Sequence, residues 1–205
     1  MKYIVLDFNG TIIDDVDVSL ECLNILRARF LNLAPLSLDE YRHIFTFPII
    51  DYYKCAGFDF KDVSFEEVGK MWVDLYLERA KCINLMDDIL SFLKKYKDSY
   101  HFIVLSASKK EMIIDDLNRF GIIDYFDEVL GIDNIYAHGK LEIAKAYFKD
   151  KKFSDYLLIG DTLHDAEVAK SVGINYKLVA KGHQAIDVLA EESAEIYHNI
   201  SDIVL

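Results

Sequence analysis

Short apolar runs alternate with amphipathic stretches along most of this chain. Five apolar runs have the length and composition of strands buried on both faces: residues 3–6, 102–105, 128–130, 156–159 and 176–179. Amphipathic stretches with helical spacing occur between and after these runs, at residues 87–96, 109–120, 141–148, 163–172 and 185–190. The alternation predicts an α/β fold, with a Rossmann-like parallel sheet sandwiched by helices and right-handed crossovers.

The stretch from residue 15 to residue 84 breaks this alternation. We find no convincing strand in it, and its pattern predicts helices at residues 18–31, 37–45, 49–56 and 65–80. About seventy helical residues are too many for an ordinary crossover. We therefore expect residues 15–84 to be an inserted all-helical cap domain, and residues 1–14 and 85–205 to form the α/β core domain. The alternative is that these helices simply cover one face of the sheet.

The helix predicted at residues 109–120 has recognisable signals at both ends. Ser108 precedes it, and Glu111 follows three residues later, which is the pattern of a capping box. Gly121 comes directly after it and predicts its end.

Composition and charge narrow the range of partners. Hydrophobic residues make up 52% of the 205-residue chain, which is enough for a substantial core and argues against disorder. The formal net charge of −12 argues against binding to nucleic acid or to an anionic membrane surface. Cys22, Cys55 and Cys82 are scattered, as free thiols in a reducing cytoplasm would be. With no signal peptide and no apolar run of membrane-spanning length, we expect a soluble cytoplasmic protein, a monomer or a homodimer.

The first apolar run ends in a carboxylate and a tight turn. Asp7 directly follows residues 3–6, and open α/β sheets bind their ligands at the carboxyl ends of their strands. Gly10 permits a sharp turn in which successive amides can face an anion, and Thr11 adds a hydroxyl group. Asp7 is therefore a candidate for chemistry, although an Asp at this place can also simply begin a turn.

Three later segments supply groups that can meet Asp7 at the same edge of the sheet. Ser106 ends the second run, Lys140 opens a helix, and Asp161 and Asp165 follow the run at residues 156–159. A nucleophilic carboxylate, a hydroxyl donor, a cation and an acidic pair suit phosphoryl transfer through an aspartyl-phosphate, with Mg²⁺ held by oxygens. Each later group also has a structural explanation: a helix cap for the serine, a solvated surface position for the lysine and the helix dipole for the acids.

The order and spacing of these segments resemble the haloacid dehalogenase superfamily over essentially the whole chain. The turn at residues 7–11 and the acids Asp161 and Asp165 carry the resemblance. The helical insertion is similar to the subclass with a helical cap, such as phosphoglycolate-phosphatase-type members. The resemblance implies that Asp7 is the catalytic nucleophile. It also implies that Asp7, the main-chain carbonyl of Asn9 and Asp161 bind Mg²⁺, and that Asp165 supports the ion mostly through water.

The same resemblance assigns residues to the phosphoryl group of a substrate. It implies that the substrate-binding residues are Gly10, Thr11, Ser106, Ala107 and Lys140. Lys140 would also act in catalysis by screening the charge of Asp7. The substrate would be a small phosphorylated metabolite, enclosed by closure of the helical cap about hinges near residues 14–15 and 84–87.

Asn9 departs from the pattern of the family's phosphatases, which usually carry a second Asp two residues after the nucleophile. That Asp protonates the leaving alkoxide and then activates water, whereas an amide cannot exchange a proton at neutral pH. Positioned acid–base groups typically contribute about 10²–10⁴-fold. We therefore expect a slow phosphatase, or one that prefers good leaving groups, and a gain with alkyl esters in Asn9→Asp. Asn9 is either natural, with another group or water in this role, or an introduced trap, or a site of deamidation.

Two other functions compete with the phosphatase. A non-catalytic or regulatory binder of a phosphate ligand is expected if Asn9 has cost the chain its turnover. A 2-haloacid dehalogenase also uses an Asp nucleophile, but that chemistry needs no metal, so Asp161 and Asp165 argue against it.

Overall fold

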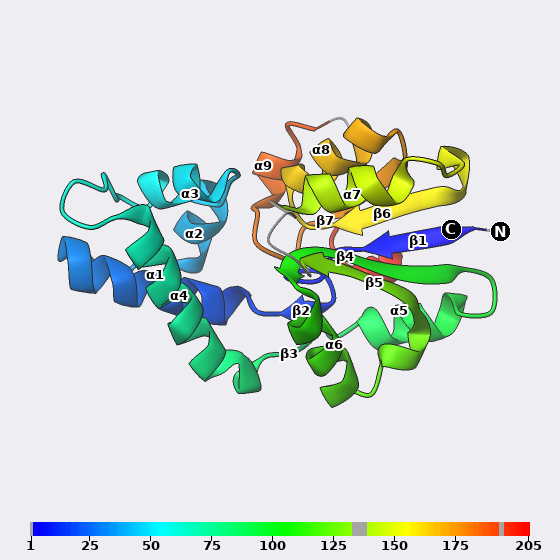
Figure 1. Ribbon diagram of the computed structural model, residues 1–205, viewed down its shortest axis with the longest axis horizontal. Coiled ribbons are helices and arrows are strands. Elements are labelled where there is room, and N and C mark those ends of the chain that lie inside the picture. Colours follow the sequence, from blue (N-terminus) through cyan, green and yellow to red (C-terminus); the bar gives the residue numbers. More distant parts are fainter. Residues whose placement is uncertain (1, 133–138, 193–194) are drawn as a thin grey trace.

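The computed structural model describes residues 2–132, 139–192 and 195–205 (Figure 1). Its centre is a parallel sheet of six strands in the order β5-β4-β1-β6-β7-β8. The strands are β1 (Tyr3–Leu6), β4 (His101–Lys109), β5 (Phe126–Ile132), β6 (Tyr156–Gly160), β7 (Asn175–Val179) and β8 (Ile196–Tyr197). The predicted α/β fold with a Rossmann-like parallel sheet is confirmed.

Helices cover both faces of the sheet (Figure 1). α5 (Ile89–Tyr96) and α6 (Lys110–Arg119) pack on one face, and α7 (Lys140–Phe148) and α8 (Leu163–Val172) pack on the other. Shorter helical segments complete this part: α9 (Ile186–Leu189), η2 (Ile123–Tyr125), η3 (Phe153–Asp155) and η4 (Ile200–Asp202). No helix among the described residues combines the length and the apolar character that crossing a bilayer would require.

The central strand β1 shows why the sheet strands read as unbroken apolar runs. Ile4 and Leu6 belong to the hydrophobic cluster beneath α5 and α6, whereas Val5 belongs to the cluster beneath α7 and α8. All three side chains are fully buried. Successive side chains of a strand point to opposite faces, so a strand covered on both faces keeps no polar position.

Four helices form a second lobe beside the sheet (Figure 1). They are α1 (Val16–Leu31), α2 (Leu38–Ile44), α3 (Ile49–Cys55) and α4 (Phe65–Arg79), followed by η1 (Ala80–Cys82). They enclose a hydrophobic cluster of their own, with Leu23, Tyr41 and Tyr52 among its buried members. Ser37 and Ser64 begin α2 and α4 with complete capping boxes, which satisfy main-chain N–H groups at both helix starts.

Two short strands connect the helical lobe to the rest of the chain. β2 (Ile13–Asp14) and β3 (Asn84–Leu85) pair antiparallel, with Ile13 opposite Leu85. The hydrophobic pattern missed both strands, and also β8, because a two-residue strand is too short to show an alternation. Asn84 therefore lies in a strand, at the border of the stretch in which we predicted none.

The capping box predicted for α6 is wrong. The residue before the helix is Lys109, and no side chain caps it. Ser108 belongs to the end of β4, and its hydroxyl donates instead to Asn9 Oδ1 at 2.8 Å. A tertiary hydrogen bond to the turn after β1 has taken the place of the local cap.

The helical lobe docks on the loop at residues 181–185 through α2. The Arg42 guanidinium donates from Nε to the Gly182 carbonyl at 2.9 Å and from Nη2 to the Lys181 carbonyl at 2.8 Å. The Arg42 carbonyl in turn accepts from the Ala185 N–H at 3.2 Å. Gln184 extends the contact by donating from Nε2 to the Phe45 carbonyl at 2.7 Å.

Replacing Arg42 should weaken this docking. Arg42→Ala removes two charge-assisted hydrogen bonds, and we expect it to cost about 1–2 kcal/mol of unfolding free energy because such bonds are stronger than neutral ones. In a chain of this size that loss lowers Tm by about 3–6 °C. Thermal denaturation checks the value, with Arg29→Ala on the exposed surface of α1 as the matched control. An equal Tm for the two variants would show that the Arg42 contacts contribute nothing.

Candidate active site

Asp7 lies where the sequence placed it, at the carboxyl end of the central strand. Its N–H donates to the Ile159 carbonyl of β6 at 2.9 Å, so pairing with the neighbouring strand fixes its main chain. Its Oδ1 accepts from the Phe8 N–H at 2.7 Å and from Lys140 Nζ at 2.8 Å. The Asp7 side chain keeps 13% exposure, whereas that of Lys140 keeps 4%. Asp7 is therefore anchored through one oxygen and is still open to solvent.

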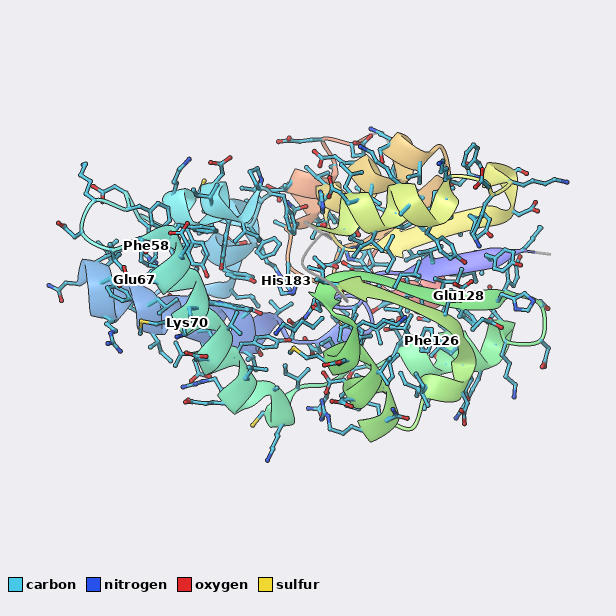
Figure 2. All side chains as sticks on the ribbon, viewed as in Figure 1. Phe58, Glu67, Lys70, Phe126, Glu128 and His183 are labelled. Atoms are coloured by element: carbon cyan, nitrogen blue, oxygen red, sulfur yellow. The ribbon has the colours of Figure 1, made fainter. Side chains whose placement is uncertain are left out.

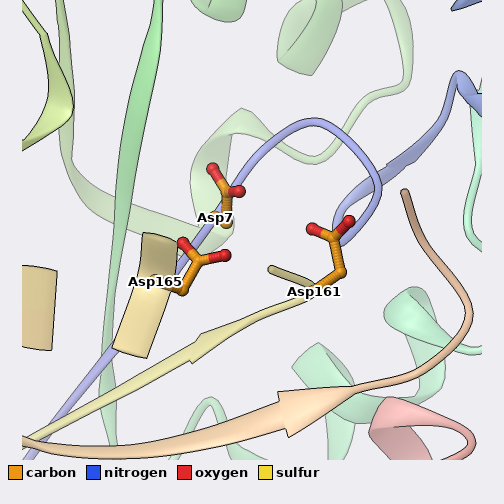
Figure 3. Close-up of side chains that lie close together, drawn as sticks. All are labelled: Asp7, Asp161 and Asp165. Atoms are coloured by element: carbon orange, nitrogen blue, oxygen red, sulfur yellow. The ribbon is translucent and has the colours of Figure 1, made fainter. Parts of the chain in front are cut away.

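Three carboxylates gather around this point. Oxygens of Asp7, Asp161 and Asp165 all lie within 4.8 Å of one another, and Figure 3 shows the three side chains turned toward a common space. Burial raises the pKa of Asp7 to about 8, against the charge of Lys140, and the charges of Asp165 and Asp161 raise it further. Burial likewise raises the pKa of Asp161 to about 6. Ionising all three together is costly because like charges crowd in a buried place.

Lys140 and Asp165 form the buried base of the centre. Lys140 opens α7 and pairs with Asp165 Oδ1 as well as with Asp7. Asp165 Oδ2 accepts from the N–H and the hydroxyl of Thr162, at 3.0 and 2.7 Å. Burial acts to raise the pKa of Asp165, but the charge of Lys140 and the hydrogen bonds from Lys140 and Thr162 together outweigh burial and lower it. Burial acts to lower the pKa of Lys140, yet both carboxylates outweigh it, so the ammonium group stays charged.

The turn after Asp7 is built around Asp161. Gly10 has a φ of +70°, and a Cβ there would overlap Asp161 Oδ2 and lie 2.7 Å from His183 Cδ2. The Thr11 hydroxyl donates to Asp161 Oδ1 at 2.9 Å, and the His183 N–H donates to Oδ2 at 2.7 Å. The fully buried Asp161 is thus held from two sides. Only a residue without a side chain fits at position 10.

The residues predicted to bind a phosphoryl group have other partners here. The Thr11 hydroxyl is engaged by Asp161, and the Gly10 N–H donates to Asp15 Oδ1 at 3.0 Å. Ser106 is buried on β4, the strand beside β1, and its Oγ accepts from the Ser108 N–H at 3.0 Å. Ala107 is the next residue of the same strand and is exposed. Their roles toward a substrate stay predictions.

The sequence pattern missed two buried charged groups next to the turn. Asp15 and His183 lie where the helical lobe meets the sheet, and His183 is labelled there in Figure 2. His183 Nε2 lies 3.2 Å from Asp15 Oδ1, and its Nδ1 lies 2.7 Å from the Tyr41 hydroxyl of α2. Burial acts to lower the pKa of His183, but Asp15, together with the charges of Asp161 and Asp7, outweighs burial and raises it to about 9. No short-range spacing signals a pair that is 168 residues apart.

Comparison with known proteins places this fold and site in a family. Residues 4–179 match the model of the family described as haloacid dehalogenase-like hydrolase, so the chain belongs to that family. A curated relative, a phosphoglycolate phosphatase of Rhodobacter capsulatus, is 23% identical over 205 residues, covering 97% of this chain and 93% of the relative. The predicted family and the predicted enzyme class, a phosphoric monoester hydrolase, are confirmed.

Solved structures share the fold over nearly the whole chain. A haloacid dehalogenase-like family hydrolase of Streptococcus pneumoniae superposes with a TM-score of 0.76 at 17% identity, over 98% of this chain and 96% of the other. Protein tyrosine kinase A of Mycobacterium tuberculosis superposes with a TM-score of 0.78 at 19% identity, over 98% and 95%. A fold shared with a protein named as a kinase does not fix the chemistry, which has to be argued from the site.

The tight fit around Asp161 can be tested at Gly10. In Gly10→Ala the new methyl group meets Asp161 Oδ2, while Gly121→Ala is a matched control with φ of +67° and nothing within 4 Å of its Cβ. Both substitutions carry the cost of a left-handed backbone, about 1 kcal/mol. Only Gly10→Ala adds crowding, so we expect its Tm to lie at least about 5 °C below that of Gly121→Ala. Equal melting temperatures would contradict the close approach.

Proposed function

We propose that this enzyme hydrolyses a small phosphomonoester through an aspartyl-phosphate on Asp7, with Mg²⁺ as its cofactor. The observation that carries the proposal is the arrangement of Asp7. Its carboxylate lies at a strand end, anchored at Oδ1 by the Phe8 N–H and by Lys140 and surrounded by two further carboxylates. Anchoring through one oxygen aims the other at a ligand, and this preorganisation lowers the cost of attack.

The reaction has two steps. In the first, Asp7 Oδ2 attacks phosphorus, an acyl-phosphate bond forms, and the bond between phosphorus and the ester oxygen breaks with its electron pair on the leaving alkoxide, which takes a proton from water. In the second, water attacks phosphorus and loses a proton to solvent, the bond between phosphorus and Asp7 Oδ2 breaks, and inorganic phosphate leaves with the Asp7 carboxylate restored. Lys140 stays protonated and, being buried between Asp7 and Asp165, offsets their negative charge while a phosphoryl dianion approaches.

The acidic cluster fits a hard divalent cation. Carboxylate oxygens are the ligands that Mg²⁺ prefers, and a cation among Asp7, Asp161 and Asp165 would keep all three ionised in spite of their crowding. We assign Asp7, the main-chain carbonyl of Asn9 and Asp161 as ligands. Each oxygen of Asp161 accepts one neutral hydrogen bond and keeps a further lone pair, whereas Asp165 Oδ1 contacts the Lys140 ammonium group and Asp165 Oδ2 accepts twice from Thr162. We therefore assign Asp165 a supporting role through water. When bound, Mg²⁺ supplies positive charge to the phosphoryl oxygens of the substrate.

The helical lobe supplies the cover of this site. We propose that residues 15–84 act as a cap domain on a core of residues 1–14 and 85–205, with β2 and β3 as the hinge. The antiparallel pairing of these strands and the separate hydrophobic cluster of the lobe support this division. We propose a cytoplasmic location and a small metabolite as substrate. Phosphoglycolate, which appears in the name of the curated relative, belongs in the first substrate panel.

Loss of the nucleophile should abolish turnover. We expect Asp7→Asn to lower kcat for p-nitrophenyl phosphate at least about 10³-fold, because an amide cannot form the acyl-phosphate. EDTA should lower kcat of the native enzyme to a similar extent, and added Mg²⁺ should restore kcat. Asp17→Asn, on the exposed surface of α1, is the matched control. Metal-independent release of chloride from a haloacid would instead identify a dehalogenase, and tight phosphate binding without turnover would identify a binder.

Asn9 should make turnover depend on the leaving group. An amide at this position cannot protonate an alkoxide, so an ester that needs a proton should react far more slowly than one that does not. We expect kcat/KM for an aryl phosphate to exceed kcat/KM for an alkyl phosphate at least about 10²-fold, because kcat/KM reports the steps up to phosphorylation of Asp7, whereas hydrolysis of the aspartyl-phosphate is common to both esters. Phosphate release from the two esters at concentrations well below KM measures the ratio. A ratio near one would show that another group donates the proton.

A further inference from the structure

The side chain of Asn9 is held in a single orientation. Its Oδ1 accepts from the Ser108 hydroxyl at 2.8 Å. Its Nδ2 donates to Asp15 Oδ2 at 2.8 Å and lies 3.1 Å from the Tyr76 hydroxyl. Turning the amide over would bring Asn9 Oδ1 against the carboxylate of Asp15, where neither atom carries a hydrogen. Asp15 therefore decides which end of the Asn9 amide faces it.

Asp15 is itself fixed as an acceptor of hydrogen bonds. Its side chain is buried, with 1% of the residue exposed. Its two oxygens accept from five donors: the Gly10 N–H, His183 Nε2, Asn9 Nδ2, the Tyr76 hydroxyl and the Ser19 hydroxyl. A carboxylate offers about four acceptor positions, so the surrounding chain uses all of them. Asp15 is not available to a substrate, and it acts through the groups it holds.

We propose that Asp15 is a positioning residue for Asn9, and that the two form a coupled carboxylate–amide pair in which residue 15 determines what position 9 can hold. Its consequence for catalysis rests on the proposed function, whereas the pairing itself does not. Asn9 lies in the turn between Asp7 and Gly10. Fixing its side chain therefore also fixes the main chain between the nucleophile and Gly10, which packs on Asp161.

The pair changes what a single substitution at position 9 should do. Asn9→Asp would set two carboxylate oxygens about as close as Asn9 Nδ2 and Asp15 Oδ2 are now, 2.8 Å, with no hydrogen between them. Two buried like charges repel strongly, so the pair would relieve the repulsion by taking up a proton shared between residues 9 and 15, and that proton is then not available to a leaving alkoxide. The gain expected from Asn9→Asp on sequence grounds therefore requires a second change at position 15.

The reciprocal exchange, Asn9→Asp with Asp15→Asn, keeps the hydrogen bonds within the pair and most of those around it; it gives up the Ser19 hydroxyl bond and the carboxylate charge next to His183. The new amide at position 15 donates to the new carboxylate at position 9, which still accepts from the Ser108 hydroxyl. The amide oxygen at position 15 still accepts from the Gly10 N–H and His183 Nε2, and the Tyr76 hydroxyl turns to accept from the amide nitrogen. The exchange also preserves the net charge of the pair.

A four-variant cycle tests the pair by thermal denaturation. We expect Asn9→Asp to lower Tm by at least about 5 °C, Asp15→Asn to lower it as well, and the exchange to melt above both single variants. Asp17→Asn, which removes an exposed carboxylate from the same helix, should stay within about 2 °C of the native protein. An exchange that folds when Asn9→Asp does not also supports the pair. Losses that simply add in the double variant, or an exchange that fails to fold where Asp15→Asn folds, overturn it.

Kinetics separate positioning from a merely structural role. In Asp15→Asn, kcat for p-nitrophenyl phosphate per folded enzyme should fall at least about tenfold while KM changes less than about twofold, because the turn loses its register and the phosphate site stays. The exchange should recover kcat and raise turnover of an alkyl phosphate at least about tenfold over native. If Asn9→Asp alone raises turnover of the alkyl phosphate as much as the exchange does, the proposed pair is wrong and the proposed phosphatase function is retained. If the melting temperatures show the rescue but no variant hydrolyses either ester, the proposed pair is retained and the proposed phosphatase function is wrong.

Discussion

The acidic centre depends on the ion pairs that the buried ammonium group of Lys140 forms. With 4% of its side chain exposed, it contacts Asp7 and Asp165 together, and Asp161 lies within the same cluster. Removing one partner from a buried ion pair leaves a charge that nothing compensates, at a cost of about 3–5 kcal/mol. The fold can place three carboxylates together only because α7 begins with a lysine at this point. The proposed chemistry and the stability of the acidic centre therefore both depend on Lys140.

Much of the fold was predictable because the sheet is covered on both faces. The apolar runs at residues 3–6 and 156–159 match β1 and β6 to within one residue, since a strand without polar positions stands out from its surroundings. Strands of two residues, such as β2 and β3, have no pattern to detect. The capping box at Ser108 failed for a different reason, because a hydrogen bond to Asn9 outcompeted the local cap.

The residues of the candidate site also divide into those that the sequence predicts and those that it does not. Asp7 and Asp161 were predictable because they directly follow strands of a parallel sheet, whose ends meet at one edge, and Asp165 because it lies in the first turn of the next helix. Asp15 and His183 were not, because their pairing joins distant parts of the chain and depends on how α2 packs. The departure at Asn9 was visible in the sequence, but its partner at position 15 became apparent only from the side-chain hydrogen bonds.

The loop at residues 181–185 has a mechanical consequence. It holds Asp161 through the His183 N–H, and it holds α2 through the carbonyls that accept from Arg42. If the helical lobe opens by the proposed rigid rotation about β2 and β3, both attachments cannot be preserved. In one case the hydrogen bonds between Arg42 and the loop break first, and the acidic centre keeps its geometry as the lobe moves away. In the other case the loop moves with the lobe, and Asp161 loses the hydrogen bond from the His183 N–H. The same five residues would thereby govern both access to the proposed active site and the arrangement of its charged groups.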